Sequence, residues 1–165
     1  MPTITDGLLF AWNKNLDYGP KLVADLSEEQ MTLQPVESGA PANHPAWIFS
    51  HLNVYLPIIA SIIQGKPFED PKGHPFGMQS KPESDASIYA SKDELVAAFV
   101  KGHEEVSRLL SETGDAALHR EIELERWKPV MPTSAFALPY LMMNHENIHL
   151  GQLSAWRRIQ GMPSV

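Results

Sequence analysis

Apolar residues recur along the chain at the three- and four-residue spacing that is typical of amphipathic α-helices. The first such stretch covers residues 5–25, and either Thr5 or Asp6 can cap its beginning. Gly19-Pro20 interrupts the pattern, so we expect a kink or a break at that point. The apolar positions of this stretch are Leu8, Leu9, Trp12, Leu16, Leu22 and Val23.

A second helix is predicted from Pro45 to about Gln64. Asn43 or His44 can cap it, because the proline that follows suits the first helical position. Pro57 lies inside this helix and should bend it, since proline removes one backbone hydrogen bond. The inward face carries Ile48, His51, Leu52, Tyr55, Ile59 and Ile62.

The segments on either side of the second helix have the composition of turns and loops. Ser27-Glu-Glu-Gln30 is predicted to form a short capped turn that ends at Gln34-Pro35. Residues 36–43 form a loop by composition. Residues 65–90 are rich in proline and glycine, and neither flank is a domain alone. We therefore expect a long surface connection there rather than an interdomain linker.

A third helix begins at the capping box Ser91-Lys-Asp-Glu94 and ends at Gly114. Its inward positions keep a regular helical spacing: Val96, Phe99, His103, Val106 and Leu110. Residues 115–133 lack that period. Ile122 and Leu124 alternate there with glutamates, which predicts an extended segment or a short strand.

The last helix is predicted over about residues 135–160, capped by Thr133 or Ser134 and closed by Gly161. Pro139 falls in its second turn, so the helix can instead begin there. Four helices joined in this way predict an all-α fold, a four-helix bundle with a long crossover connection. A length of 165 residues fits a single domain over 1–165 that buries one core.

Charge and composition restrict the partners of the chain. A net charge of −7 without a Lys/Arg cluster argues against a nucleic-acid partner, which needs a basic face. The absence of cysteine excludes disulfides and thiolate ligands. We see no signal peptide at the N-terminus, and no segment approaches the about 20 apolar residues of a membrane span. We therefore expect a cytoplasmic protein without a membrane partner.

The strongest chemical signal is the string His145-Glu-Asn-Ile-His149, which lies in the last helix and close to the C-terminus of the chain. Histidines four residues apart project from one helix face, so they form a pair of imidazole ligands for a divalent transition metal. The string also matches the zincin protease signature His-Glu-x-x-His. A zincin takes its third ligand from downstream, and residues 150–165 contain no histidine, acidic residue or cysteine. A metal site is therefore expected, and a metalloprotease is not.

The third ligand must come from upstream of His145. A di-iron carboxylate site is excluded, because it needs two Glu-x-x-His pairs and the chain has only Glu146-x-x-His149. His51 and His103 both lie on inward helix faces, where a lone histidine is first interpreted as a hydrogen-bonded core residue. For His103 we favour that core interpretation, while His51 stays open on the pattern alone.

Three segments, in this order, resemble the DinB/YfiT superfamily of metal-binding four-helix bundles. They are Leu26-Ser-Glu-Glu-Gln-Met31 with Gln34-Pro35, Pro45-Ala-Trp-Ile-Phe-Ser-His51-Leu52, and His145-Glu-Asn-Ile-His149-Leu-Gly-Gln-Leu153. In that family the second helix supplies one histidine and the last helix supplies two. The resemblance therefore implies metal ligands at His51, His145 and His149. The long connection after the second helix also agrees with it.

The resemblance also implies a reaction class. Characterised relatives include S-transferases that use thiols such as bacillithiol or mycothiol, and a maleylpyruvate isomerase. Three neutral ligands leave the 2+ charge of a metal facing open positions, which acidifies water and deprotonates a thiol. We expect a small-molecule enzyme, either a thiol-dependent S-transferase that uses a low-molecular-weight thiol or a hydrolase. A non-catalytic bundle that binds a metal or a ligand is the alternative.

Several further residues are candidates for the site. Glu146 lies about 100° from His145 around the helix, so it can flank the metal or face solvent. We favour a solvated glutamate, or one that supports the ligands, over a catalytic one. Gln152 shares a face with His149 and can orient a ligand or a substrate. Asn144, Trp47 and Tyr55 can line a pocket, although an aromatic residue beside an apolar stripe is more often part of the core. Imidazole suits several metals, and we expect nickel or zinc, with iron or manganese as alternatives. The resemblance further implies a homodimer.

Overall fold

The computed structural model describes residues 1–34 and 42–165. Most of the loop predicted at 36–43 and Pro35 of the preceding turn lie outside the described residues. The helices are α1 (Ile4–Tyr18), α2 (Pro45–Gln64), α3 (Lys92–Thr113), and a continuous C-terminal helix made of α4 (Ser134–Pro139), the π-helical turn η6 (Tyr140–His145) and α5 (Glu146–Ile159). Short 3-10 turns lie between them: η1 (Pro20–Leu22), η2 (Glu29–Thr32), η3 (Pro71–Gly73), η4 (Ala86–Ile88) and η5 (Gly114–His119).

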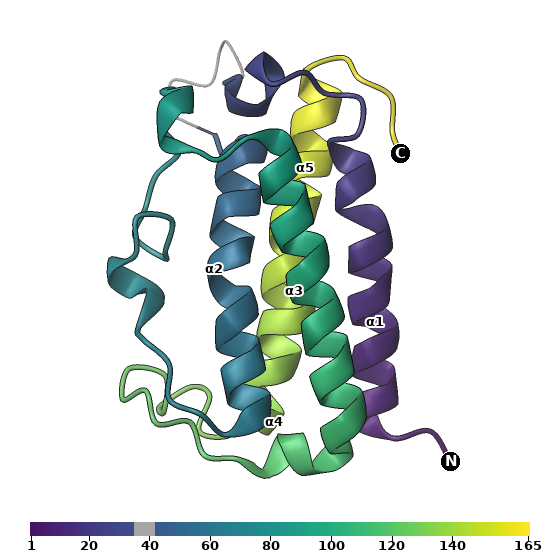
Figure 1. The fold of residues 1–165 in the computed structure, drawn as a ribbon, viewed down its shortest axis with the longest axis vertical. Helices are drawn as coiled ribbons and strands as arrows, with labels where there is room; N and C mark the ends of the chain where they lie inside the picture. The colour runs from purple at the N-terminus through teal and green to yellow at the C-terminus, as the bar shows by residue number, and fades with distance from the viewer. Residues whose placement is uncertain (35–41) are drawn as a thin grey trace.

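The helices form the all-α four-helix bundle that the sequence predicts. In Figure 1, α1 and the C-terminal helix run upward, whereas α2 and α3 both run downward and pack against each other. Parallel neighbours about 30 Å long need a connection that returns along the whole bundle. The segment between α2 and α3 does this on the outside of α2, which confirms the long crossover (Figure 1).

Helix α1 begins two or three residues earlier than its predicted caps suggested. Thr3, not Thr5 or Asp6, is the cap: its hydroxyl accepts from the Asp6 amide at 3.1 Å, and the Asp6 carboxylate accepts from the Thr3 amide at 2.7 Å. This capping box was missed because aspartate replaces the usual glutamate or glutamine. The helix ends at Tyr18, so the break predicted at Gly19-Pro20 is confirmed.

Helix α2 lies against both α3 and the C-terminal helix. His44 caps it by accepting from the Trp47 amide at 3.2 Å, and Pro45 takes the first position, as predicted. All six of its predicted inward residues are buried. Within the described residues, α2 is the one helix that is long and apolar enough to cross a membrane. The expectation that no segment approaches the length and apolar composition of a membrane span is therefore wrong. Most of this helix is buried inside the bundle, as is usual for a core helix.

Of the two alternatives predicted around Ile122 and Leu124, an extended segment or a short strand, the strand is wrong. In this part of the described chain, one isolated antiparallel bridge joins Glu121 to Thr133. The Ile122 amide donates to the Pro132 carbonyl at 3.1 Å. The alternation placed the side chains correctly, since Ile122 is buried and its neighbouring glutamates are exposed. A strand needs a continuous series of hydrogen bonds to its neighbour. One bridge does not provide this series, so the segment around Ile122 is irregular.

The C-terminal helix has nearly the predicted extent, and Thr133 occupies its cap position. It is not a uniform α-helix, because the turn Tyr140–His145 is π-helical. That wide turn follows directly after Pro139, which cannot donate a backbone hydrogen bond. The π-helical turn ends at His145, so it sets the direction in which this histidine projects.

Two apolar clusters fill the bundle. His103 lies between them, fully buried, with its ring stacked on Trp12 at 3.7 Å between centroids and 4.2 Å from the ring centroid of Phe99. Trp12 belongs to one cluster and Phe99 to the other. A buried polar residue therefore joins the two halves of the core.

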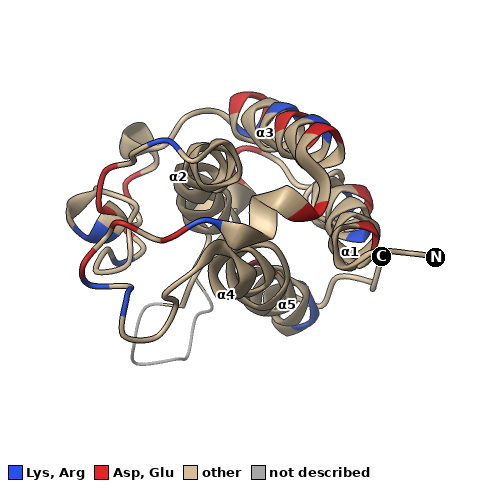
Figure 2. Ribbon diagram, turned by 90° about the horizontal axis from the view of Figure 1, so that it is seen from below, with Lys and Arg blue, Asp and Glu red and all other residues tan. Residues whose placement is uncertain are grey.

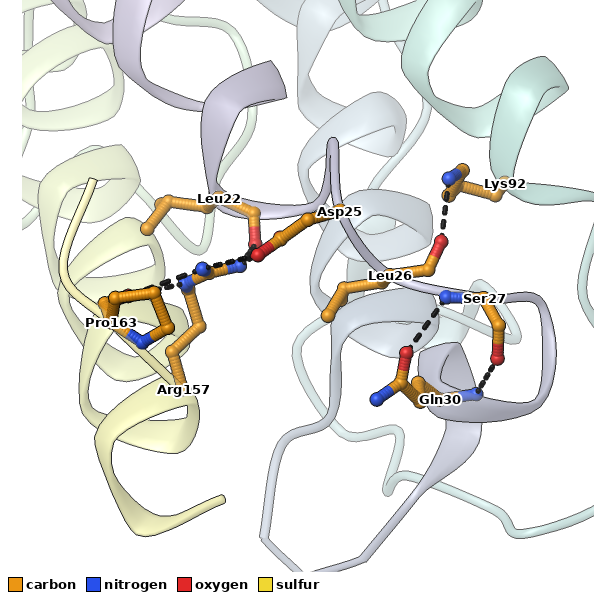
Figure 3. Close-up of polar contacts among 8 residues, drawn as sticks. All are labelled: Leu22, Asp25, Leu26, Ser27, Gln30, Lys92, Arg157 and Pro163. Atoms are coloured by element: carbon orange, nitrogen blue, oxygen red, sulfur yellow. Dashed lines mark hydrogen bonds and ion pairs between the residues drawn. The ribbon is translucent and has the colours of Figure 1, made fainter. Parts of the chain in front are cut away.

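Arg157 of α5 ties the end of the chain to the segment that follows α1 (Figure 3). Its buried guanidinium donates to the carbonyls of Leu22 at 2.9 Å and Pro163 at 3.1 Å, and to the carboxylate of Asp25. Lys92, at the start of α3, donates to the Leu26 carbonyl at 2.6 Å (Figure 3). The segment after α1 is thus fixed to two helices.

Charged side chains lie mainly on the outside of the bundle. Figure 2 shows acidic and basic residues interspersed along α3 in the part of the chain that the structure describes. On this helix Arg108 pairs with Glu105 and Glu112, one turn to either side. Exposed pairs of this kind add little stability, about 0.3–0.5 kcal/mol each.

Candidate metal centre

Three histidine side chains from two helices converge in the structure. His51 comes from α2, His145 ends the π-helical turn, and His149 lies one turn later on α5. One nitrogen of each lies within 4.8 Å of the others. The Nε2 atoms of His51 and His145 are 3.0 Å apart, although 94 positions separate these residues in the sequence. The structure thus brings together the three residues that the resemblance implied.

The crossover connection fixes the ring of His51. Its Nδ1 lies 2.7 Å from the carbonyl oxygen of Phe76. Because a carbonyl can only accept, Nδ1 carries the proton and Nε2 presents its lone pair to the other histidines. The ring also stacks on Trp47 at 4.7 Å between centroids, with 13° between the planes. Both contacts hold the ring in the orientation that a ligand needs.

Gln152 fixes the ring of His149 in a similar way. Its Oε1 lies 3.1 Å from Nδ1 of His149 and also accepts from the side-chain amide of Asn43 at 2.9 Å. An amide oxygen accepts, so Nδ1 of His149 is the protonated nitrogen and Nε2 is free to bind a metal. Gln152 therefore lies where it can orient His149, the first of the two roles considered for it.

Burial keeps all three imidazoles neutral. Burial, together with His149, lowers the pKa of His51 to about 4. Burial, with His149 and His51, lowers the pKa of His145 to about 3. Burial lowers the pKa of His149 as well, although the hydrogen bond to Gln152 opposes this shift. Histidine must be neutral to ligate a metal. At neutral pH these three side chains are already neutral, so metal binding does not require a proton to be removed from them.

The donor set fits a divalent transition metal. Two nitrogens bound at about 2.0–2.1 Å to a tetrahedral ion lie about 3.3–3.4 Å apart, near the 3.0 Å between His51 and His145. All three donors lie within 4.8 Å of one another, so a small movement of side chains can bring them to one ion. Three protein ligands with further positions open are the pattern of catalytic sites rather than closed structural ones.

The three histidines line a pocket of about 590 Å³. Most of the remaining wall is aromatic or aliphatic, including Trp47, Tyr55, Trp127, Met131, Tyr140 and Leu141. Trp47 and Tyr55 belong to the buried core and also line the pocket, whereas Asn144 is exposed and does not line this pocket. The volume and the largely apolar wall suit a small-molecule ligand.

Glu146 points away from the pocket and into the core. Its Oε2 lies 3.1 Å from Nε2 of His103, and the residue is 2% exposed. Burial raises the pKa of Glu146 well above its ordinary value and lowers the pKa of His103 to about 3. Glu146 therefore neither faces solvent nor lines the pocket, and its catalytic role stays a prediction. His103 is the hydrogen-bonded core histidine that the sequence favoured, outside the group of three.

Some residues that shape the site carried no signal in the sequence. Phe76 acts through its backbone carbonyl, a group that every residue has. Asn43 and Arg126 reach the site from loops, whose paths no periodicity describes. The π-helical turn had one indication, Pro139 inside the helical pattern, which we interpreted as a possible start of the helix.

The chain was compared with protein families, curated proteins and solved structures. The family model of the DinB superfamily matches residues 12–153, a range that contains His51, His145 and His149. No curated protein and no solved structure matches. The helical bundle agrees with the fold of that superfamily. Because the match covers far more than half of the chain, the protein belongs to the DinB superfamily.

Proposed function

We propose that this protein is a metal-dependent enzyme for a small molecule, with His51, His145 and His149 as the metal ligands. The observation that carries the proposal is the convergence of three neutral imidazoles in the wall of an apolar pocket. The reactions are transfer of a low-molecular-weight thiol to an electrophile, or hydrolysis. Nickel or zinc is the expected ion, and iron or manganese are the alternatives.

A divalent ion with three neutral ligands supplies Lewis acidity, which deprotonates a thiol or lowers the pKa of water. The chain supplies orientation. Phe76 and Gln152 hold the proton-bearing nitrogens of two ligands, so their other nitrogens face the site. Tyr55 lies 4.5 Å from His145 between ring centroids, and burial raises its pKa. Tyr55 therefore stays a phenol at neutral pH and can donate a hydrogen bond to a reacting group.

The test is turnover by protein loaded separately with zinc, nickel, iron or manganese. One panel combines low-molecular-weight thiols with electrophilic acceptors, and the other contains esters and amides for hydrolysis. We expect a thiol-dependent or hydrolytic activity that needs the metal and falls by about 100-fold or more in His51→Ala, since losing a ligand exceeds the about 10–100-fold cost of losing a supporting contact. His119→Ala, an exposed histidine of η5, is the matched control and should keep the activity.

Two results separate the alternatives. A well-folded, metal-loaded protein without activity in either panel would sink the enzymatic proposal and favour the non-catalytic binder. Activity that persists in both His51→Ala and His145→Ala would show that the chemistry lies elsewhere in the chain.

A further inference from the structure

Arg126 is the one cationic side chain among the described residues that line the histidine pocket. It lies in the irregular segment between η5 and α4, and 28% of its side chain is exposed. One edge of its guanidinium faces Asp70 on the crossover connection. Nε donates to Oδ2 of Asp70 at 3.0 Å, and Nη2 donates to Oδ1. This two-point contact fixes the plane of the guanidinium.

The other end of the guanidinium has a poor partner. Within the described part of the chain, the hydrogen bond recorded for Nη1 goes to the sulfur of Met78 at 3.5 Å, and Met78 also lines the pocket. A thioether is a weak acceptor, whereas a guanidinium N–H is a strong, charged donor. Nη1 of Arg126 can therefore leave the sulfur of Met78 and donate to a stronger acceptor on a ligand in the pocket.

Asp70 is held in place independently of Arg126. Its Oδ1 accepts from the Lys72 amide at 2.9 Å, at the start of η3. The hydrogen bond from Arg126 lowers the pKa of Asp70 to about 2, so the carboxylate stays ionised at neutral pH. The guanidinium carbon also lies 5.7 Å from the ring centroid of Trp127, another pocket residue. Arg126 is therefore oriented before any ligand arrives.

We propose that Nη1 of Arg126 binds a carboxylate of the substrate, which makes the substrate an apolar or aromatic compound with an acidic group. The inference rests on the proposed function in one respect, namely that the substrate occupies the histidine pocket. The carboxylate lies at Arg126, the apolar body lies along the aromatic wall, and the reacting group faces the histidines. Arg126 thereby determines specificity and takes no part in bond making.

The charge of the protein gives this contact its importance. A net charge of −7 repels anions at long range, and Asp70 offsets the charge of Arg126 locally. A preference for acidic over neutral ligands must therefore come from a short-range, directed hydrogen bond from Arg126 to the bound ligand. A hydrogen bond to a charged group contributes about 1.5–3 kcal/mol, which corresponds to an affinity ratio of about ten or more.

The experiment compares phenylacetate, 3-phenylpropionate and 4-phenylbutyrate with their primary amides. Binding is followed by tryptophan fluorescence, because Trp47 and Trp127 line the pocket, in both metal-free and zinc-loaded protein. We expect at least one acid to bind about tenfold or more tightly than its amide, in both forms of the protein. Arg126→Gln should abolish that preference. Arg108→Gln, which removes an arginine from ion pairs on α3, is the matched control and should retain it.

The outcomes distinguish this inference from the proposed function. A preference for acids that survives Arg126→Gln would assign the carboxylate to the metal or to another group, and would overturn the inference. Equal binding of acids and amides, or no binding of any probe, would overturn it too. A preference that depends on Arg126 in a protein without metal-dependent turnover would support this acid site while contradicting the enzymatic proposal. Urea unfolding of Arg126→Gln provides the check that the variant is folded.

Discussion

Oε2 of Glu146 lies 3.1 Å from Nε2 of His103 in the interior of the bundle, where the two side chains are 3% and 0% exposed. His145, the residue directly before it, faces the pocket instead. Successive residues of a helix point about 100° apart, so one short string serves both the core and the site. The glutamate that completes the apparent protease string is therefore buried in the bundle against His103.

The first prediction concerns this buried pair. Glu146→Leu or His103→Leu alone should each lower the free energy of unfolding by about 1–3 kcal/mol, because each leaves a buried polar partner unsatisfied. The double variant should lose less than the sum of the two. Urea unfolding of metal-free protein measures all four forms, and strictly additive effects would contradict an energetic link between the side chains.

The second prediction concerns the ligand set. Purified protein should hold one divalent ion per chain, and His51→Ala, His145→Ala and His149→Ala should each lose it. Elemental analysis measures the ion, and His119→Ala should retain it. Because the metal binds only the folded state of the chain, adding it should raise the melting temperature of the wild type. It should not raise the melting temperature of the ligand variants. Unchanged metal content in His51→Ala would disprove the three-histidine site.

The third prediction concerns the contact that orients His149. Gln152→Leu keeps the size of the side chain but removes the oxygen that accepts from Nδ1. The metal affinity should fall by about 10–100-fold, the usual effect of losing such a supporting contact. Gln152→Glu restores an acceptor and should recover most of the affinity in the same titration. Equal affinity in the leucine and glutamate variants would show that Gln152 does not support the site.

The fourth prediction contrasts two helical glycines. A Cβ at Gly102 would lie 2.4 Å from Cδ1 and 2.9 Å from Cβ of Leu56, where α2 and α3 approach each other. Gly102→Ala should therefore destabilise the protein by about 1–3 kcal/mol through overpacking. Gly151 in α5 has open space around it, so Gly151→Ala should stabilise by about 0.5–1 kcal/mol. Opposite shifts of the urea midpoint are expected, and a stabilising Gly102→Ala would contradict the close approach.

The fifth prediction uses the ion pair between Arg157 and Asp25. The hydrogen bond from Arg157 lowers the pKa of Asp25 below its ordinary value of 3.8. The pair therefore stabilises the fold above that pH, and its contribution is lost as the pH falls through the lower pKa of the folded protein. Asp25→Asn should lower the urea midpoint at pH 7, and its difference from the wild type should shrink in strong acid. Asp17→Asn, which removes a carboxylate at an exposed position of α1, is the matched control.

Helical periodicity in the sequence predicted the number, order and inward faces of the helices well. Phe99, His103 and Val106 of α3, for example, are all buried. Periodicity reports which side of an element is buried, but it does not report the hydrogen bonds that the backbone makes. For this reason Ile122 was placed on the correct side of a strand that does not exist.

The site could be predicted only in part. The spacing of His145 and His149 gives two ligands that share a helix face, and this information is local. The position of His51 depends on how α2 packs, so a family resemblance was needed to select it. The supports from Phe76 and Asn43 come from connections whose paths depend on the finished fold. Neither side chain type indicates metal binding, and so neither residue could be found in advance.

The π-helical turn Tyr140–His145 separates two α-helical segments of the last helix. It offsets the side-chain faces of these segments by a rotation about the helix axis. Residues of α4 before the turn and of α5 after it do not share one continuous surface stripe, because the wide turn changes the register between them. Leu138 can therefore keep its place in the core, while His145 and His149 are aimed at the pocket. A change in the number of residues in this turn would rotate α5 relative to α4 and turn both histidines away from the pocket.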